Sequence, residues 1–211
     1  REACARLRKQ GVESVAIGLI FAHVNGDHED RVAQIVAEEM PGIPVSLGHR
    51  ILSRAPEYDR ISTTVVNAYV APRVNAYLER LVSRLAQAGY ARQLMVMQAS
   101  GGVMTRAYIE AAPIRLLASG PAGGVIASAR TGGAKGYRNL LCVDMGGTSY
   151  DMSVVRDGAA PAEAGWNMHH RYLVGVPMVQ VETLGAGGGS ICHVDKGELK
   201  VCLLYTSPSP R

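Results

Sequence analysis

The sequence predicts an α/β fold from three observations. Nearly half of the 211 residues are apolar and 19% are charged, a balance typical of a globular domain. Short apolar runs rich in β-branched residues alternate with segments of helical periodicity. From residue 116 onward, dense glycines separate further short strand-like runs. These features favour layers of strands and helices.

The N-terminal 60 residues predict the order strand, helix, strand. Residues 14–21 form an apolar run suited to a buried strand, and residues 43–47 form a second one. Between them, Asp27 is expected to cap a helix. Its inward face is expected to carry Val32, Ile35 and Val36.

The clearest periodicity covers residues 62–88, where apolar side chains recur every three or four positions. This spacing predicts one long helix whose apolar and aromatic stripe packs into the core. Pro72 is expected to kink or divide it. A strand at 94–98 and a turn at 100–102 follow. The stripe comprises Val66, Tyr69, Val70, Val74, Tyr77, Leu78, Leu81, Val82 and Leu85.

Further on, Pro121 suits the first turn of a helix of small residues over 122–130. Two strands are expected at 140–143 and 152–155. The dipeptide Asp157-Gly158 is a hairpin signal.

The segment LLCVDMGGTSYDMSVV, residues 140–155, is the strongest candidate for chemistry. Its glycines allow close approach of the backbone to a ligand, and N–H and hydroxyl groups in such a loop can face phosphate oxygens. We expect Asp144 to hold Mg²⁺ through water or to orient an attacking group. No Walker A lysine follows the loop, and an ordinary Gly-Gly hairpin is the alternative interpretation. The expected phosphate contacts are Gly146, Gly147, Thr148 and Ser149.

A second candidate ligand loop is GAGGGS, residues 185–190, which a flexible connection between strands would explain nearly as well. Its expected binding residues are Gly187, Gly188, Gly189 and Ser190. The turn at residues 100–102 is a weaker candidate for lining a cleft.

Composition argues against several other classes. The net charge of +4 comes from scattered basic residues, so no nucleic-acid partner is expected. No apolar run is long enough to span a bilayer. The four cysteines form no CxxC pair, and Cys142 is expected to be a buried, reduced thiol of a cytoplasmic protein. The six histidines lack metal-site spacing, and His169-His170 are expected on the surface or in a loop.

The loop at 144–151 resembles the second phosphate loop of the actin, hexokinase and heat-shock chaperone ATPases. In that superfamily a small-residue helix opened by proline precedes the loop by about twenty residues, as GPAGGVIA at 120–127 does here. The resemblance implies an actin-like (ribonuclease H-like) fold, present incompletely, with mixed sheets and flanking helices.

Five motifs in order resemble the hydantoinase A/5-oxoprolinase family, which includes ATP-dependent ketone carboxylase subunits. They are ISTTVVNAYVAP at 61–72, MQASGGVM at 97–104, SGPAGGV at 119–125, DMGGTSYD at 144–151 and LGAGGGSI at 184–191. Two positions depart from the family's pattern. Ser100 stands where Asn is common, and Tyr150 stands where a smaller residue is often found.

The resemblance implies ATP and Mg²⁺ as cofactors and the opening of a cyclic amide, such as a hydantoin or 5-oxoproline, by phosphorylation of its carbonyl. Asp144 would serve Mg²⁺ or water, and Asp151 would orient the loop or a second water. One alternative is a ketone carboxylase subunit that uses bicarbonate. Another is a nucleotide-gated binding module. A hydantoinase B-type subunit, or a fused second half, is the implied partner.

The resemblance also divides the chain. Residues 1–118 would form the end of a first lobe with linking helices, and residues 119–200 the connecting helix and second lobe. Residues 201–211 are expected to be a tail outside the family, because the composition changes abruptly there; it resembles a translated sequencing adaptor or another added sequence. A first phosphate loop is expected upstream of Arg1, so the isolated chain is expected to bind ATP poorly.

Overall fold

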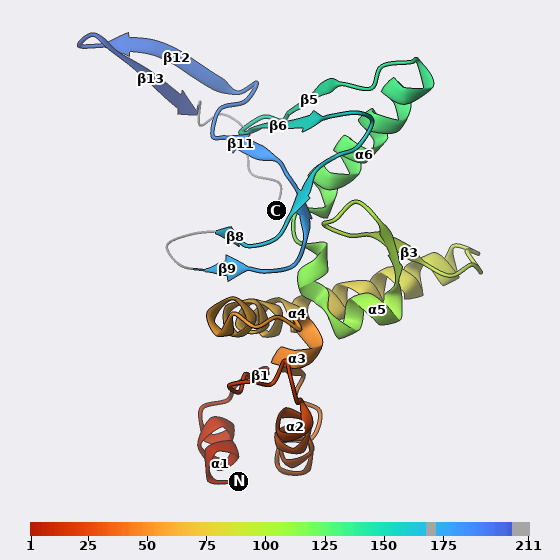
Figure 1. Cartoon of the computed structure of the whole chain (residues 1–211), viewed down its shortest axis with the longest axis vertical. Helices are drawn as coiled ribbons and strands as arrows, with labels where there is room; N and C mark the ends of the chain where they lie inside the picture. The colour runs from red at the N-terminus through yellow and green to blue at the C-terminus, as the bar shows by residue number, and fades with distance from the viewer. Residues whose placement is uncertain (168–171, 204–211) are drawn as a thin grey trace. The chain divides into compact units, whose positions relative to one another are not determined.

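The computed structural model describes residues 1–167 and 172–203, so His169 and His170 lie outside the described residues. The fold is α/β, with short strands in small sheets and helices packed against them (Figure 1). The chain forms two compact units. Unit 1 comprises residues 1–119 and 163–178, and unit 2 comprises residues 120–162 and 179–211.

Unit 1 opens with the predicted strand, helix, strand order, with strands shorter than expected. Strands β1 and β2 pair in parallel, with Val15 opposite Val45. The helix between them has Gly26 as its N-cap, so the expectation of an Asp27 cap is wrong. Asp27 is the first helical residue, and its N–H donates to Asn25 Oδ1 over 2.8 Å. The elements are α1 (Glu2–Lys9), β1 (Val15–Ile17), α2 (Asp27–Glu39), β2 (Val45–Leu47) and α3 (Gly48–Ile51).

The long helix α4 (Glu57–Gln87) begins before the predicted position and continues through Pro72. The predicted stripe reaches the core only in part. Leu78 is 0% exposed, and Val66 and Val74 pack against core clusters, as expected. The expectation is wrong for the aromatic members, because Tyr69 is 71% exposed and Tyr77 is 55% exposed. The buried face also includes polar and small residues in its first half. It comprises Arg60, Thr63, Thr64, Asn67, Ala68, Ala71 and Leu78.

Hydrogen bonds explain this choice of face. Asn67 Nδ2 donates to Ser46 Oγ over 2.9 Å, and Asn67 Oδ1 accepts from Ile114 N over 2.9 Å. Thr63 Oγ1 accepts from Gly175 N over 2.8 Å. Buried polar groups are tolerated when they are paired in this way. Periodicity of apolar residues therefore identified the helix and the aliphatic part of its buried side, but not the polar residues on that side.

The rest of unit 1 packs around this face of α4. Strands β3 and β4 form an antiparallel hairpin whose turn contains Gly101 at φ +87°. The predicted strand at 94–98 and its turn are confirmed, whereas β4 was not predicted. The core joins Ile51, Ala99, Ile114, Val174 and Val176. The elements are β3 (Met95–Met97), β4 (Val103–Thr105), α5 (Arg106–Ala111), the 3₁₀ turn η1 (Pro113–Leu116), β8 (Trp166–Asn167) and β9 (Leu173–Val174).

Unit 2 contains a three-stranded antiparallel sheet, in the order β11–β6–β5, with α6 on one face, and a separate antiparallel hairpin of β12 and β13. Pro121 lies in the first turn of α6, as predicted. A Cβ at Gly132 would come within 2.6 Å of Leu140 Cδ1, so the helix packs closely on β5. The elements are α6 (Ser119–Ala134), β5 (Leu140–Met145), β6 (Tyr150–Val155), β11 (Glu182–Leu184), β12 (Ser190–Asp195) and β13 (Glu198–Leu203), with β7 (Ala162–Glu163) and β10 (Met178–Val179) near the junctions of the units. Among the described residues, no helix is long and apolar enough to cross a membrane.

Candidate functional site

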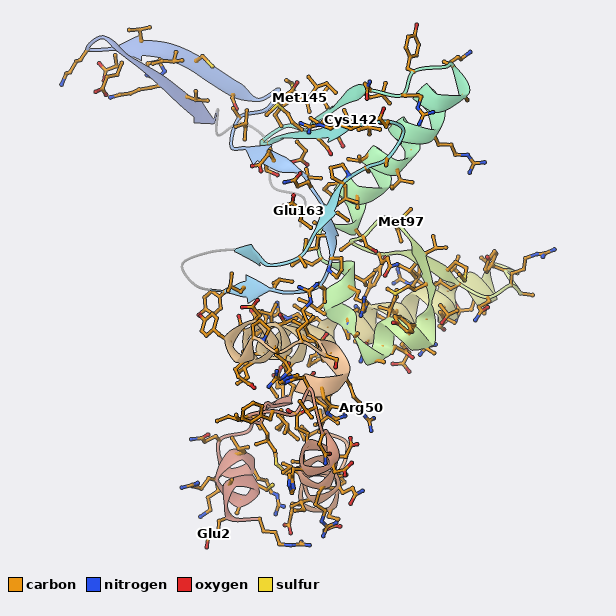
Figure 2. All side chains as sticks on the ribbon, in the orientation of Figure 1. Glu2, Arg50, Met97, Cys142, Met145 and Glu163 are labelled. Carbon is orange, nitrogen blue, oxygen red and sulfur yellow. The ribbon has the colours of Figure 1, made fainter. Side chains whose placement is uncertain are left out.

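The hairpin of β5 and β6 places two carboxylates opposite each other. In the antiparallel register Asp144 pairs with Asp151, and the loop is closed by a hydrogen bond from Gly146 N to Ser149 O over 2.9 Å. Side chains alternate along a strand, so both aspartates share a face with Cys142, which packs toward α6. Figure 2 labels Cys142 and Met145, which belong to opposite faces of β5. As predicted, Cys142 is buried with a free thiol.

The tip of this loop presents free hydrogen-bond donors. Gly147 and Thr148 are exposed, and their N–H groups donate no hydrogen bond to any described residue. The Thr148 hydroxyl is likewise without a partner among the residues that the structure describes. Free backbone donors in a tight loop are suited to bind phosphate oxygens.

The second glycine loop, residues 185–190, packs directly on this hairpin. Gly188 N donates to Gly146 O over 2.9 Å, and Gly189 N donates to Gly147 O over 2.8 Å. A Cβ at Gly187 would lie 2.6 Å from Gly146 O, so only glycine fits there. The structure thus brings the two predicted loops together, and the glycine loop contacts the carbonyl side of the turn.

This packing uses the donors of the glycine loop internally. Gly187 N donates to Ser190 Oγ over 2.8 Å, and Ser190 N donates to Gly187 O over 2.9 Å. The N–H groups of Gly188 and Gly189 are bonded to the hairpin. The arrangement supports a positioning role for this loop, and direct contact of residues 187–190 with a nucleotide stays a prediction.

The sequence did not single out Thr183, which contacts one of the two carboxylates. Thr183 lies opposite Asp151 in the pairing of β11 with β6, and its Oγ1 donates to Asp151 Oδ1 over 2.6 Å. Asp144 makes no hydrogen bond to a described residue. The only signal in the sequence for Thr183 was that it lies two residues before the glycine loop at residues 185–190. Thr183 therefore orients the carboxylate of Asp151, whereas the carboxylate of Asp144 has no hydrogen-bond partner among the described residues.

A pocket of about 220 Å³ lies between α6 and the hairpin of β5 and β6. Its walls include Pro121, Gly124 and Ser128 of the helix. The sheet contributes Asp144 and Asp151, beside the buried Cys142 and Ser153. The turn Ser100–Gly102, the weaker candidate, belongs to the β3–β4 hairpin of unit 1.

The two carboxylates fit a hydrated magnesium ion that also binds phosphate. Like charges directly opposite each other on neighbouring strands are unfavourable, and a cation relieves this repulsion. Mg²⁺ commonly uses one or two carboxylates together with phosphate oxygens and water. Within the described residues, no group of three or more His, Cys, Asp or Glu side chains forms a metal cluster. A site built by protein ligands alone is therefore absent from this part of the chain.

Comparison with known proteins gives matches over most of the chain. Residues 60–203 match the family described as hydantoinase/oxoprolinase, and residues 1–40 match its N-terminal region. Caprolactamase subunit alpha of Pseudomonas jessenii is 37% identical over 188 residues, covering 89% of this chain and 27% of that protein.

Two solved structures are similar in fold. The ATP-dependent caprolactamase from Pseudomonas jessenii gives a TM-score of 0.78 at 36% identity, and a nucleotide-free acetone carboxylase gives 0.78 at 27% identity. Each comparison covers 95% of this chain and 29% of the solved chain. This chain thus spans less than a third of the length of these relatives.

Proposed function

Because this chain belongs to the hydantoinase/oxoprolinase family, we propose that the complete protein containing it uses ATP and Mg²⁺ to open a cyclic amide. The observation that supports this most directly is the β5–β6 loop, where free N–H groups lie beside paired carboxylates. The choice of a cyclic amide rests on similarity. The solved caprolactamase is 36% identical to this chain, whereas the solved acetone carboxylase is 27% identical.

In the proposed site, the N–H groups of Gly147 and Thr148 and the hydroxyls of Thr148 and Ser149 bind phosphate oxygens. Asp144 holds Mg²⁺ or the water bound to it, and Asp151, held by Thr183, keeps the hairpin and a second water in place. Mg²⁺, when bound, neutralises charge on the phosphate oxygens. Gly187, Gly188, Gly189 and Ser190 support the turn from its carbonyl side.

The proposed reaction has three steps. The amide oxygen attacks the γ-phosphorus of ATP, and the bond to the β-γ bridging oxygen breaks to release ADP. Water then adds to the amide carbon and the C–N bond breaks, so that the amine takes up a proton and an acyl phosphate remains. A second water hydrolyses the acyl phosphate to a carboxylate and inorganic phosphate. Phosphorylation removes the resonance that protects the amide and creates a leaving group. The protein's contribution is positioning and charge neutralisation.

We also propose that the chain is part of an actin-like, ribonuclease H-like ATPase. Residues 1–118 would end the first lobe, and residues 119–200 would supply the connecting helix and the second phosphate loop. A hydantoinase B-type subunit or fused domain is the proposed partner. In support, the relative from Pseudomonas jessenii is itself named as a subunit.

The deciding experiment measures phosphate release from Mg-ATP by the complete protein with its partner. Caprolactam, 5-oxoproline, a hydantoin, and a ketone with bicarbonate are compared. We expect one cyclic amide to stimulate release, and Asp144→Asn to abolish the stimulation. If only the ketone with bicarbonate stimulates phosphate release, the protein is instead a carboxylase subunit, an alternative that the similar fold of acetone carboxylase supports. ATP hydrolysis at the same rate with and without each of these four additions would support a nucleotide-gated binding module.

A further inference from the structure

Unit 1 contains a second pocket, of about 260 Å³, remote in sequence from the phosphate loop. Strand β2, helices α3 and α5, and η1 form its walls. Its polar lining residues are Ser46, Arg50, Tyr108 and Arg115, and the others are aliphatic. No aspartate or glutamate lines it, so its two guanidinium groups face a cavity without a negative charge of its own.

Arg115 is the principal feature of this pocket. Its guanidinium carbon lies 5.5 Å from the centroid of the Tyr108 ring, a cation–π distance that fixes the orientation of the fork. Arg115 Nε is closed to solvent and has no hydrogen-bond partner, and the side chain forms no ion pair with a described residue. An oxyanion bound in the pocket would therefore be held by the terminal Nη groups of Arg115, which also have no partner among the described residues.

Two further groups can contribute donors. Arg50, labelled in Figure 2, donates through Nη2 to Asp30 Oδ1 over 2.7 Å and keeps its other N–H groups available. Ser46 is 4% exposed, and its Oγ accepts from Asn67 Nδ2, so its own hydroxyl proton is free for an acceptor. Because Asp30 already neutralises Arg50, Arg115 carries the uncompensated charge.

We propose that this pocket is a binding site for a small oxyanion, a carboxylate or phosphate, held by the guanidinium of Arg115 with support from Arg50 and Ser46. A planar guanidinium binds either group through two parallel hydrogen bonds. The aliphatic lining accommodates a short carbon chain, which favours a carboxylate such as acetate or succinate. The site lies within unit 1 and is independent of the nucleotide function proposed for unit 2.

The test uses the complete protein that contains this chain, titrated by calorimetry with acetate, succinate and inorganic phosphate at constant ionic strength. Constant ionic strength separates binding from general screening. We expect saturable binding of at least one anion, and a Kd raised about tenfold or more by Arg115→Met, which keeps the stem but removes the charged donors. Arg50→Met should raise the Kd less, because Asp30 already pairs with Arg50. Arg80→Met, at an exposed arginine of α4 without an ion pair among the described residues, is the matched control and should leave the Kd unchanged.

Hydrogen exchange on the unsubstituted protein gives a readout that does not depend on any variant. The bound anion should slow amide exchange in residues 106–116, which contain Tyr108 and Arg115. Absence of saturable binding by all three anions, or equal affinity in Arg115→Met and the wild type, would overturn the proposal. A preference for succinate over phosphate would identify a carboxylate ligand, and the reverse would identify a phosphate.

Discussion

The hydroxyl of Thr183 donates a hydrogen bond to Oδ1 of Asp151 over 2.6 Å, joining residues 32 positions apart in the chain. Asp151 in turn lies opposite Asp144, which has no hydrogen-bond partner among the described residues. One carboxylate of the pair is therefore oriented by the protein, and the other is available to a ligand.

Removal of the Thr183 hydroxyl should impair the proposed reaction without unfolding the sheet. Thr183→Val keeps the shape and the β-branch, and we expect substrate-stimulated phosphate release to fall roughly 10- to 100-fold, as for other residues that orient groups beside a metal site. Thr183→Ser should restore most of the rate, because serine keeps the donor. Equal rates in Thr183→Val and the wild type would show that the hydrogen bond is not needed.

Neutralising Asp144 should have opposite effects on the free and the liganded protein. In the absence of ligand, Asp144→Asn relieves repulsion from Asp151 and should stabilise the protein by up to about 1 kcal/mol. With Mg-ATP, the stabilisation that ligand binding adds to the wild type should be lost. Thermal unfolding with and without Mg-ATP measures both effects. If Mg-ATP stabilises the variant as much as it stabilises the wild type, Asp144 does not take part in the proposed site.

The contact between the two glycine loops predicts a large difference between neighbouring glycines. Gly187→Ala would place its Cβ 2.6 Å from Gly146 O and 2.8 Å from Ser149 N, so the loops must separate. We expect a loss of about 1–3 kcal/mol, as for other overpacking substitutions. Gly185→Ala meets no heavy atom within 4 Å and is the matched control. Hydrogen exchange of residues 140–155 should accelerate in Gly187→Ala and stay unchanged in Gly185→Ala.

Glu29 is a buried acceptor on which the first layer of unit 1 depends. It is 0% exposed, and its carboxylate accepts from Leu19 N over 2.8 Å and from His49 N over 2.9 Å. Its Oε2 also lies 2.7 Å from His49 Nδ1. Glu29→Gln leaves at least one of these donors unpaired, and should lower the free energy of unfolding by about 1–3 kcal/mol.

The control for Glu29 is Glu79→Gln, on the exposed surface of α4, which should change stability by less than about 0.5 kcal/mol. Denaturant unfolding followed by circular dichroism measures both variants. If the Glu29→Gln variant is as stable as the control, the contacts of Glu29 with Leu19 and His49 make no net contribution to the free energy of unfolding.

The buried face of α4 can be tested with two substitutions. Leu78 is 0% exposed, and Leu78→Ala should destabilise unit 1 by about 2–5 kcal/mol through the cavity it leaves. Tyr69, on the opposite side, is 71% exposed, so Tyr69→Ala should change the stability by no more than about 0.5 kcal/mol. A larger loss for Tyr69→Ala than for Leu78→Ala, measured by denaturant unfolding, would reverse the assignment of faces.

The sequence by itself determined the parts whose interactions are local. The β5–β6 hairpin follows from two apolar runs around a short Gly-Gly-Thr-Ser loop, and the loop's length places Asp144 opposite Asp151. The helix at α4 and the first turn of α6 likewise follow from periodicity and from Pro121, because hydrogen bonds within a helix join residues four apart.

Only the tertiary structure decided the contacts between distant segments. The burial of polar Asn67 on α4 depends on hydrogen bonds with Ser46 and Ile114, residues 21 and 47 positions away. Three other contacts also join segments that are far apart in the sequence. They are the packing of Gly187 on Gly146, the hydrogen bond from Thr183 to Asp151, and the position of Arg50 and Arg115 around one pocket. Periodicity records which residues are apolar, whereas these contacts depend on where the chain returns and on which polar groups find partners there.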